Sequence, residues 1–113
     1  MYEIFQGDDD IFNVIVKDEN GDLVDISDID LLFSVKDRDS YAILFSKSSN
    51  PTNTDRLEKD DPTNGHAKIY INGSDTESLL GAYQFDIQLT LANGMVKTFV
   101  KDILMVKGDI SAP

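Results

Sequence analysis

Three oxygen-bearing side chains near the N-terminus have the spacing of a calcium-binding loop. Asp18, Asn20 and Asp22 occupy alternate positions, as the first three ligands of an EF-hand loop do, and calcium prefers such carboxylate and amide oxygens. The rest of that pattern is missing, because Leu23 stands where the loop requires glycine and Ile29 where it requires a bidentate glutamate. Two interpretations stay open: a calcium site that is not an EF-hand, or a hydrated turn whose carboxylates bind backbone N–H groups.

Further carboxylates flank this segment and widen the choice of calcium ligands. Asp25 is the fourth candidate, and a site at the edge of the fold would form if Asp25 or Asp28 lay near one of three aspartates that precede the apolar run. These three are Asp8, Asp9 and Asp10. The chain has 21 acidic and 10 basic residues, so carboxylates that are close in sequence are common and specify no site by themselves.

Catalytic chemistry finds little support in the sequence. His66 is the only histidine, and it follows Asn64-Gly65, a pair typical of a turn, so we expect an exposed turn residue rather than a general base. The sequence has no cysteine, no GxSxG nucleophile motif and no glycine-rich phosphate loop. It therefore predicts a protein that is not an enzyme and uses no cofactor.

The acidic composition limits the partners that the chain can bind. The formal net charge is −11, which repels both nucleic-acid phosphates and anionic membrane surfaces. No apolar run reaches the roughly 18 residues that a membrane-spanning helix needs. The N-terminus, MYEIFQGDDD, lacks the basic and apolar regions of a signal peptide. We expect neither nucleic acid nor a membrane as partner, and synthesis in the cytoplasm of the producing cell.

The elements that must position these side chains are mostly β-strands. Apolar and polar residues alternate in several short segments, and Asn20-Gly21 and Asn93-Gly94 supply the turn residues that hairpins need. The predicted strands cover residues 12–16, 23–26, 29–35, 41–47, 67–71, 83–91 and 95–107, with a further short strand near Leu57 and a loop over 48–61. About seven strands without a long amphipathic helix predict an all-β, immunoglobulin-like antiparallel β-sandwich with one short helical turn.

Local patterns add three expectations to this outline. Ser74 and Glu77 have the spacing of a capping box, so the helical turn should begin at Ser74 and end by Gly81. Tyr83 is either the tyrosine corner of an immunoglobulin-like sandwich or simply a core aromatic. Alternation is irregular over residues 100–103, where we expect a β-bulge.

The aromatic residues fall mostly on apolar faces at strand spacing, so we expect them in the core. They are Phe12, Phe33, Phe45, Tyr70, Tyr83, Phe85 and Phe99. The N-terminal arm is the exception, because Tyr2, Ile4 and Phe5 precede the acidic residues. This arm either pairs as a first strand or docks onto a neighbouring subunit, and its three apolar residues are the candidate interface residues.

Five short motifs follow one another along nearly the whole chain. They are GD at 7–8, DENG at 18–21, VDI at 24–26, DTESLLGAYQFDIQ at 75–88 and LMVKGD at 104–109. In this order they resemble the immunoglobulin-like domain of tailed-bacteriophage virion proteins, in particular the N-terminal domain of phage baseplate upper proteins. The shared features are turns, caps and core positions, so the resemblance indicates the fold more specifically than the function.

The resemblance implies a non-enzymatic structural protein of a bacteriophage virion, made in the cytoplasm of the bacterial host. It would serve as an assembly or attachment module in the tail or baseplate, bound to other virion proteins and to further copies of itself through strand edges, the N-terminal arm and loop 47–61. The alternatives are a calcium- or carbohydrate-binding module at a host-recognition surface and a capsid decoration protein. We expect the sandwich over residues 1–108 and a C-terminal tail over 109–113, in a protein that stands alone or is one domain of a longer chain.

Overall fold

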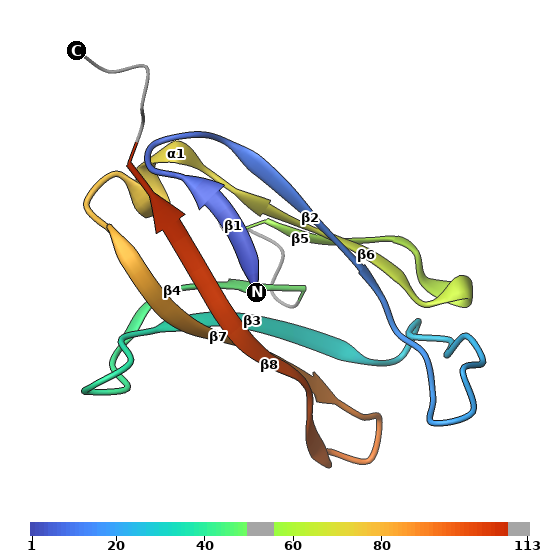
Figure 1. The fold of residues 1–113 in the computed structure, drawn as a ribbon. Helices are drawn as coiled ribbons and strands as arrows, with labels where there is room; N and C mark the ends of the chain where they lie inside the picture. The colour runs from blue at the N-terminus through green and yellow to red at the C-terminus, as the bar shows by residue number, and fades with distance from the viewer. Residues whose placement is uncertain (50–55, 109–113) are drawn as a thin grey trace.

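Short alternating segments form two β-sheets that pack face to face, as a computed structural model describes for residues 1–49 and 56–108 (Figure 1). One sheet has five strands in the order β1-β8-β7-β3-β4, and the other has three in the order β2-β6-β5. The elements are β1 (Tyr2–Phe5), β2 (Asp10–Ile15), β3 (Asp30–Lys36), β4 (Ile43–Ser48), β5 (Leu57–Asp61), η1 (Pro62–Asn64), β6 (His66–Ile71), α1 (Gly73–Thr76), β7 (Gly81–Thr90) and β8 (Val96–Lys107). The predicted all-β sandwich is confirmed, whereas the predicted tail over 109–113 lies outside the described residues.

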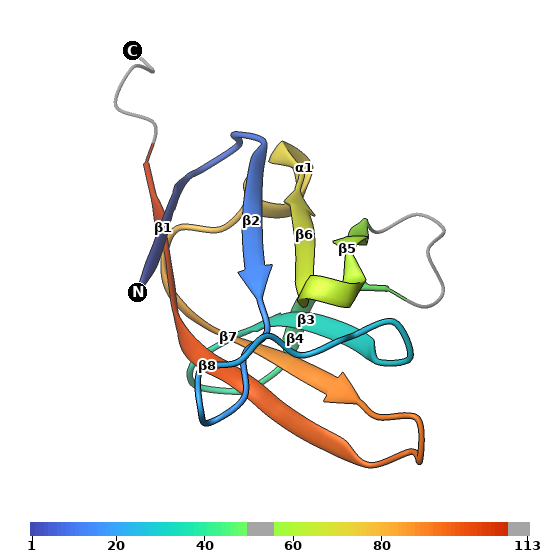
Figure 2. The ribbon, with the colours of Figure 1, turned by 90° about the vertical axis from the view of Figure 1, so that its right-hand side faces the viewer.

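The N-terminal arm closes one side of the sandwich. β1 pairs with β8 in parallel, while every other pair of neighbouring strands is antiparallel, so the arrangement is mixed rather than purely antiparallel. After β1 the chain turns at Gly7 and enters the other sheet as β2, and Figure 2 shows the two strands side by side at the left. One short segment therefore contributes to both layers.

Alternate residues of the strands fill the space between the sheets. Phe33 of β3 lies at the centre of an aromatic group, with its ring centroid 5.7 Å from that of Phe85, 6.1 Å from that of Phe12 and 6.2 Å from that of Phe45. The other fully buried apolar residues of the core are Val16, Ile26, Leu31, Val35, Leu57, Ala67, Ile69, Ile71, Ile87, Leu104 and Val106. Because large rings bury much apolar area, this contact supplies much of the stability of the sandwich.

The predicted return strand over 23–26 is wrong. Its contact with the preceding segment consists of one bridge between Lys17 and Leu23 and a hydrogen bond from Val24 N to Val16 O at 3.0 Å, and it forms no strand. Ile26 instead donates its backbone N–H to Pro62 O at 2.8 Å and buries its side chain completely in the core. The segment fails to pair as a strand because its backbone bonds to η1 and because Asp25 turns the chain through a hydrogen bond from Ser27 N at 2.9 Å.

The helical turn begins two residues earlier than predicted. Asn72, not Ser74, is the N-cap, and the Asp75 carboxylate accepts the N–H of Asn72 at 2.8 Å to complete a capping box. The cause is contact with the β1–β2 turn, since a Cβ on Gly73 would collide with the carbonyl oxygen of Gly7. Gly81 does not end the helix either, because it lies at the start of β7 with a φ of 105°.

The structure chooses between the two interpretations of Tyr83 and places the bulge of β8 slightly outside its predicted range. The hydroxyl of Tyr83 accepts a hydrogen bond from Leu80 N at 3.0 Å and donates one to Leu80 O at 3.1 Å, which is the backbone contact of a tyrosine corner. The bulge in β8 is also present, but one residue before the predicted range. Ile87 pairs with Val100 and Gln88 with Thr98, so Phe99 is the extra residue.

A buried ion pair joins the two sheets. Lys47 of β4 stands opposite Phe33 in the strand register, so its side chain enters the sandwich, where it is 0% exposed. Its Nζ lies 2.7 Å from Oδ2 of Asp75, the carboxylate that also caps α1 after β6. Lys47 therefore connects the edge of the five-stranded sheet to the end of the three-stranded sheet. Nothing in the alternation of residues 41–47 predicts this contact.

Removing Asp75 should destabilise the protein much more than removing Lys47. In Asp75→Ala the buried Lys47 ammonium loses the Asp75 carboxylate and α1 loses its cap, so we expect the free energy of unfolding to fall by about 3–5 kcal/mol. Lys47→Met keeps the packing and leaves Asp75 bound to Asn72 N, so its cost should be near zero to about 1 kcal/mol. Urea unfolding of both single variants and the double variant measures the free energy of unfolding of each. Adding Lys47→Met to Asp75→Ala should recover most of the lost stability, because the bond to Asn72 N stays lost but no ammonium is buried, and simple additivity would contradict the assignment.

Candidate functional site

The first three calcium candidates lie in one tight turn that is already closed by hydrogen bonds. Oδ1 of Asp18 accepts the backbone N–H of Asn20 at 2.9 Å and of Asp22 at 3.0 Å, and Gly21 N donates to Asp18 O at 3.0 Å. Gly21 has a φ of 84°, which the turn requires and which glycine adopts without strain. The Asp18 carboxylate thus binds backbone N–H groups of its own turn, as the hydrated-turn interpretation expects.

The remaining acidic candidates do not meet. Asp9 and Asp10 precede or begin β2, whereas Asp25 lies beyond its other end, about 20 Å away along a strand of this length. Asp9 accepts Gly73 N at 2.7 Å, and Asp10 accepts the Tyr2 hydroxyl at 3.1 Å. Among the residues that the structure describes, no group of three or more histidines, cysteines, aspartates or glutamates is arranged to hold a metal ion.

A lysine supplies the positive charge next to Asp25. The ammonium of Lys59 donates to three backbone carbonyls: Ile26 O at 3.1 Å, Ser27 O at 3.1 Å and Ile29 O at 3.0 Å. Convergent carbonyls of this kind are ligands that a hard cation would use, and here the protein's own cation binds them. Sequence reasoning missed Lys59, since its partners lie 30 or more residues earlier in the chain.

Asp25 belongs to the same loop. Its Oδ1 accepts the Ser27 hydroxyl at 2.6 Å and the Ser27 N–H at 2.9 Å. These bonds stabilise the charged carboxylate, so the hydroxyl first, then the backbone N–H and the Lys59 charge, hold the pKa of Asp25 below its ordinary value. The carboxylate is thereby used to fold the loop.

The three candidate interface residues pair as a first strand, which was one of the two predicted outcomes for the arm. Ile4 is in the core, and Tyr2 packs its ring 4.3 Å from that of Phe12. The Tyr2 hydroxyl donates to Asp10, and burial followed by this contact raises the pKa of Tyr2 to about 12. Phe5 alone is exposed, at 43%, so most of the arm is occupied within its own subunit.

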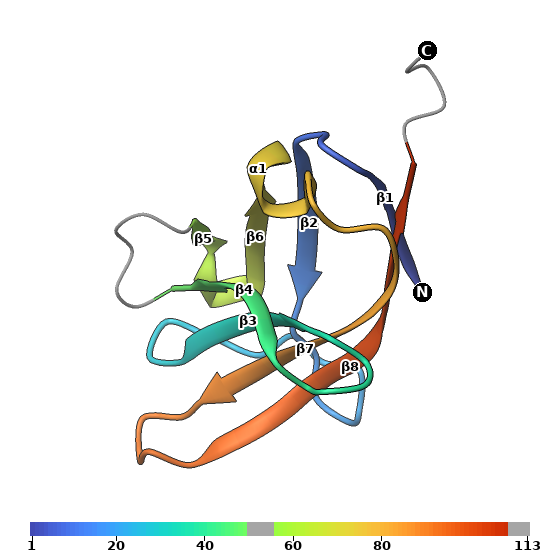
Figure 3. The ribbon, with the colours of Figure 1, turned by 90° about the vertical axis from the view of Figure 1, so that its left-hand side faces the viewer.

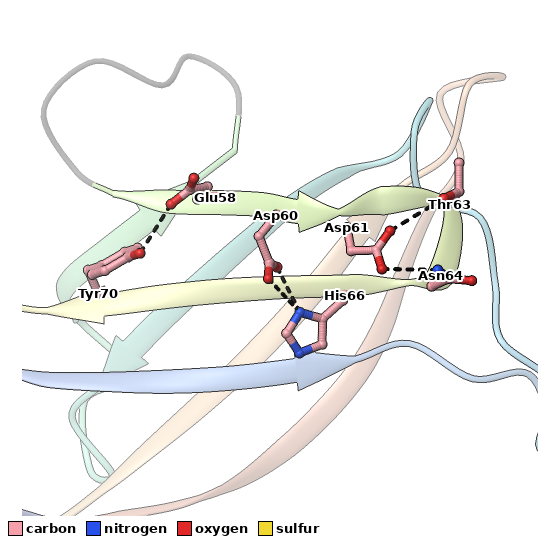
Figure 4. Close-up of polar contacts among 7 residues, drawn as sticks. All are labelled: Glu58, Asp60, Asp61, Thr63, Asn64, His66 and Tyr70. Atoms are coloured by element: carbon pink, nitrogen blue, oxygen red, sulfur yellow. Dashed lines mark hydrogen bonds and ion pairs between the residues drawn. The ribbon is translucent and has the colours of Figure 1, made fainter.

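The outer face of β5 and β6 carries a group of polar contacts (Figure 4). Nδ1 of His66 lies 2.8 and 2.7 Å from the two carboxylate oxygens of Asp60. The histidine is the first residue of β6 rather than an exposed turn residue, because β5 and β6 pair at this point. Within the described residues no hydrogen bond joins this pair to a serine or threonine hydroxyl, so the contacts provide no activated nucleophile.

Tyr70 corrects the expectation that the aromatics lie in the core. It points outward between the buried Ile69 and Ile71, and its hydroxyl donates to Glu58 at 3.1 Å. The guanidinium of Arg56 lies 4.0 Å from the centroid of the Tyr70 ring and covers one face of it. This face of the ring is therefore not free to stack on a sugar.

Two shallow hollows border this network. One is lined by Asp9, Asp10, Ile11, Tyr70, Ile71 and Asn72, where β2 begins and β6 ends. The other is lined by Ser49, Arg56, Leu57, Glu58 and Lys59. Residues 50–55 of the predicted loop lie outside the described residues. The carboxylates of the first hollow already bind Gly73 and Tyr2, so it offers acidic surface rather than an organised site.

An exposed apolar strip lies at the opposite edge of the molecule. Residues 41–44, with the sequence YAIL, are all exposed where the chain enters β4. Sequence analysis assigned a strand here but missed the exposure. The available signal was the run of five apolar residues at 41–45, which is incompatible with a strand that faces solvent on alternate positions.

Comparison with known proteins identifies no relative. No protein-family model, curated protein or solved structure matches the chain. In the described parts of the chain, no helix is long and apolar enough to cross a bilayer. Functional conclusions therefore rest on the residues and contacts of the chain itself.

Replacing Lys59 tests whether its ammonium holds the loop of residues 26–29. Lys59→Met removes three hydrogen bonds from a charged donor, and we expect the free energy of unfolding to fall by about 1–3 kcal/mol. Lys97→Met is the matched control, because Lys97 is exposed on β8. Thermal unfolding of both variants measures the difference, and equal stability of the two would show that the carbonyls do not depend on Lys59.

Proposed function

We propose that the chain is a non-enzymatic structural module of a tailed-phage virion, with an immunoglobulin-like sandwich that contacts other tail or baseplate proteins. The observation that carries this proposal is the order of the strands. In an immunoglobulin-like domain with strands named A to G, one sheet contains B, E and D and the other contains G, F, C and C′. Taking β2 to β8 as B, C, C′, D, E, F and G gives those two orders, B-E-D and G-F-C-C′.

The positions that carry the phage resemblance support the same proposal, because they have structural roles. The GD motif lies at the turn between β1 and β2, where Gly7 N donates to the Thr76 hydroxyl at 3.1 Å. The DENG motif is the turn closed by Asp18, and the later motif contains the α1 cap and the Tyr83 corner. A chain selected for this architecture would retain these residues whatever partner it binds.

The alternatives receive less support from the contacts. For calcium, the candidate carboxylates bind backbone groups, and Lys59 occupies the convergent carbonyls. For carbohydrate, the half-buried ring of Tyr70, which lines one hollow, is covered on one face by Arg56. A capsid decoration protein shares the proposed fold, so location in the particle separates it from a tail component.

Virions provide the direct test. Tailed-phage particles produced by cells that carry the gene are purified on a density gradient, and antibodies raised against the chain are used for quantitative blotting and immunogold labelling. We expect a fixed number of copies per particle, with gold at the tail or baseplate. Gold on the head would favour the decoration alternative, and particles free of the chain would overturn the virion assignment.

A further inference from the structure

Four asparagine–glycine pairs occur in the chain, and each has the chemistry to lose its side-chain amide by reaction with its own backbone. The pairs are Asn20-Gly21, Asn64-Gly65, Asn72-Gly73 and Asn93-Gly94. In such a pair the backbone nitrogen after the asparagine attacks the side-chain carbonyl carbon, and glycine leaves that nitrogen unobstructed because it has no side chain. All four asparagines are exposed, so exposure to water does not distinguish them. The contacts around each pair do.

Two of the pairs are enclosed by other segments of the chain. A Cβ on Gly65 would lie 2.7 Å from each of two backbone carbonyl oxygens, so this glycine is fixed between them. A Cβ on Gly73 would collide with Gly7 O, and Gly73 N donates to a carboxylate at 2.7 Å. The side chains are held as well, because Asn64 donates to a neighbouring aspartate at 2.9 Å and Asn72 is the N-cap of α1. Neither pair is free to bring its two reacting atoms together.

The other two pairs lie in open turns. A Cβ on Gly21 or on Gly94 would meet no atom within 4 Å. Figure 3 shows the turn between β7 and β8, which carries the second of these pairs, projecting at the lower left. The two side chains differ, however. Oδ1 of Asn93 accepts Met95 N at 3.0 Å, whereas no hydrogen bond of the Asn20 side chain is found within the described residues. Asn20 is therefore open in both its backbone surroundings and its side chain.

We propose that Asn20 is a site of spontaneous deamidation, with water as the only co-reactant. The backbone nitrogen of Gly21 gives up its proton and bonds to Cγ of Asn20, the Cγ–Nδ2 bond breaks, and ammonia leaves with that proton. The succinimide ring that results takes up one water molecule, which opens it at either carbonyl. One opening gives aspartate, and the other gives isoaspartate, whose main chain runs through the side-chain carbon. The reaction does not depend on the virion assignment.

Either product changes the turn of residues 18–22. It adds one negative charge to a net charge of −11, in a turn that already carries Asp18, Glu19 and Asp22, and like charges this close repel. Isoaspartate also lengthens the main chain by one carbon. In the unmodified turn Asp18 Oδ1 accepts two N–H groups, that of Asn20 at 2.9 Å and that of Asp22 at 3.0 Å, and this spacing fits the normal main chain. Deamidation should therefore loosen the connection between β2 and β3.

Peptide mass mapping of the purified chain, sampled during a long incubation at mildly alkaline pH, measures the conversion of all four pairs in one experiment. We expect Asn20 to lose its amide first and Asn93 to react about five-fold more slowly, the factor that one hydrogen bond contributes. Asn64 and Asn72 should keep their amides. A sample unfolded in guanidinium chloride is the control, because there the four pairs should react at similar rates. An Asn20 that keeps its amide, or that reacts no faster than Asn93, would overturn the proposal.

Asp18→Ala tests whether the turn itself restrains the reaction. Gly21 N donates to Asp18 O at 3.0 Å, and it has to leave this bond before it can attack Asn20. Without the Asp18 carboxylate the turn opens more often, so conversion at Asn20 should become about five-fold faster, while conversion at Asn93 stays unchanged. Glu19→Ala is the matched control, because it removes a neighbouring negative charge from an exposed side chain that makes no hydrogen bond within the described residues. Equal rates in the two variants would contradict the role assigned to the turn.

Discussion

The sandwich depends on a charge that it has to bury. Lys47 points from an edge strand into the space between the sheets, where an ammonium is costly unless a carboxylate meets it. Asp75 meets it at 2.7 Å, and that carboxylate is held in place by the capping of α1. The position of α1 in turn requires Gly73 to lie against the turn at Gly7. β4, α1 and the N-terminal arm are therefore positioned together.

The same use of carboxylates recurs at the surface and explains the acidic composition better than a ligand does. Asp37 closes the β3–β4 hairpin by accepting the N–H groups of Asp39 and Ser40 at 2.9 and 3.0 Å, and these bonds lower its pKa, that of Ser40 first. Asp102 accepts Ile103 N at 2.7 Å, and the N-terminal ammonium at 3.0 Å also lowers its pKa. Each of these groups stabilises the fold while it is ionised. Their contribution to the free energy of unfolding is fully present above the ordinary pKa of aspartate, and it is lost as the pH falls through their lowered pKa values.

The sequence predicts most of this architecture where the information is local. Alternation locates the long strands, asparagine–glycine pairs locate turns, and Tyr83 is identified from its place near the start of β7. Prediction from the sequence fails where contacts with distant segments determine the local structure. The segment 23–26 looks like a strand until η1 binds Ile26, and the helix start depends on Gly7. Lys47 and Lys59 have no local signature, since their partners lie 28 or more residues away.

We infer that the acidic turn of residues 18–22, closed by hydrogen bonds to Asp18, serves the fold rather than calcium binding. Thermal unfolding of Asp18→Ala in calcium and in a chelator tests it most directly, with the unmodified chain beside it. If the turn is architectural, the substitution lowers stability by about 1 kcal/mol through the lost backbone hydrogen bonds, by the same amount in both solutions. A melting temperature that rises with calcium in the unmodified chain, and no longer does so in Asp18→Ala, would contradict the claim.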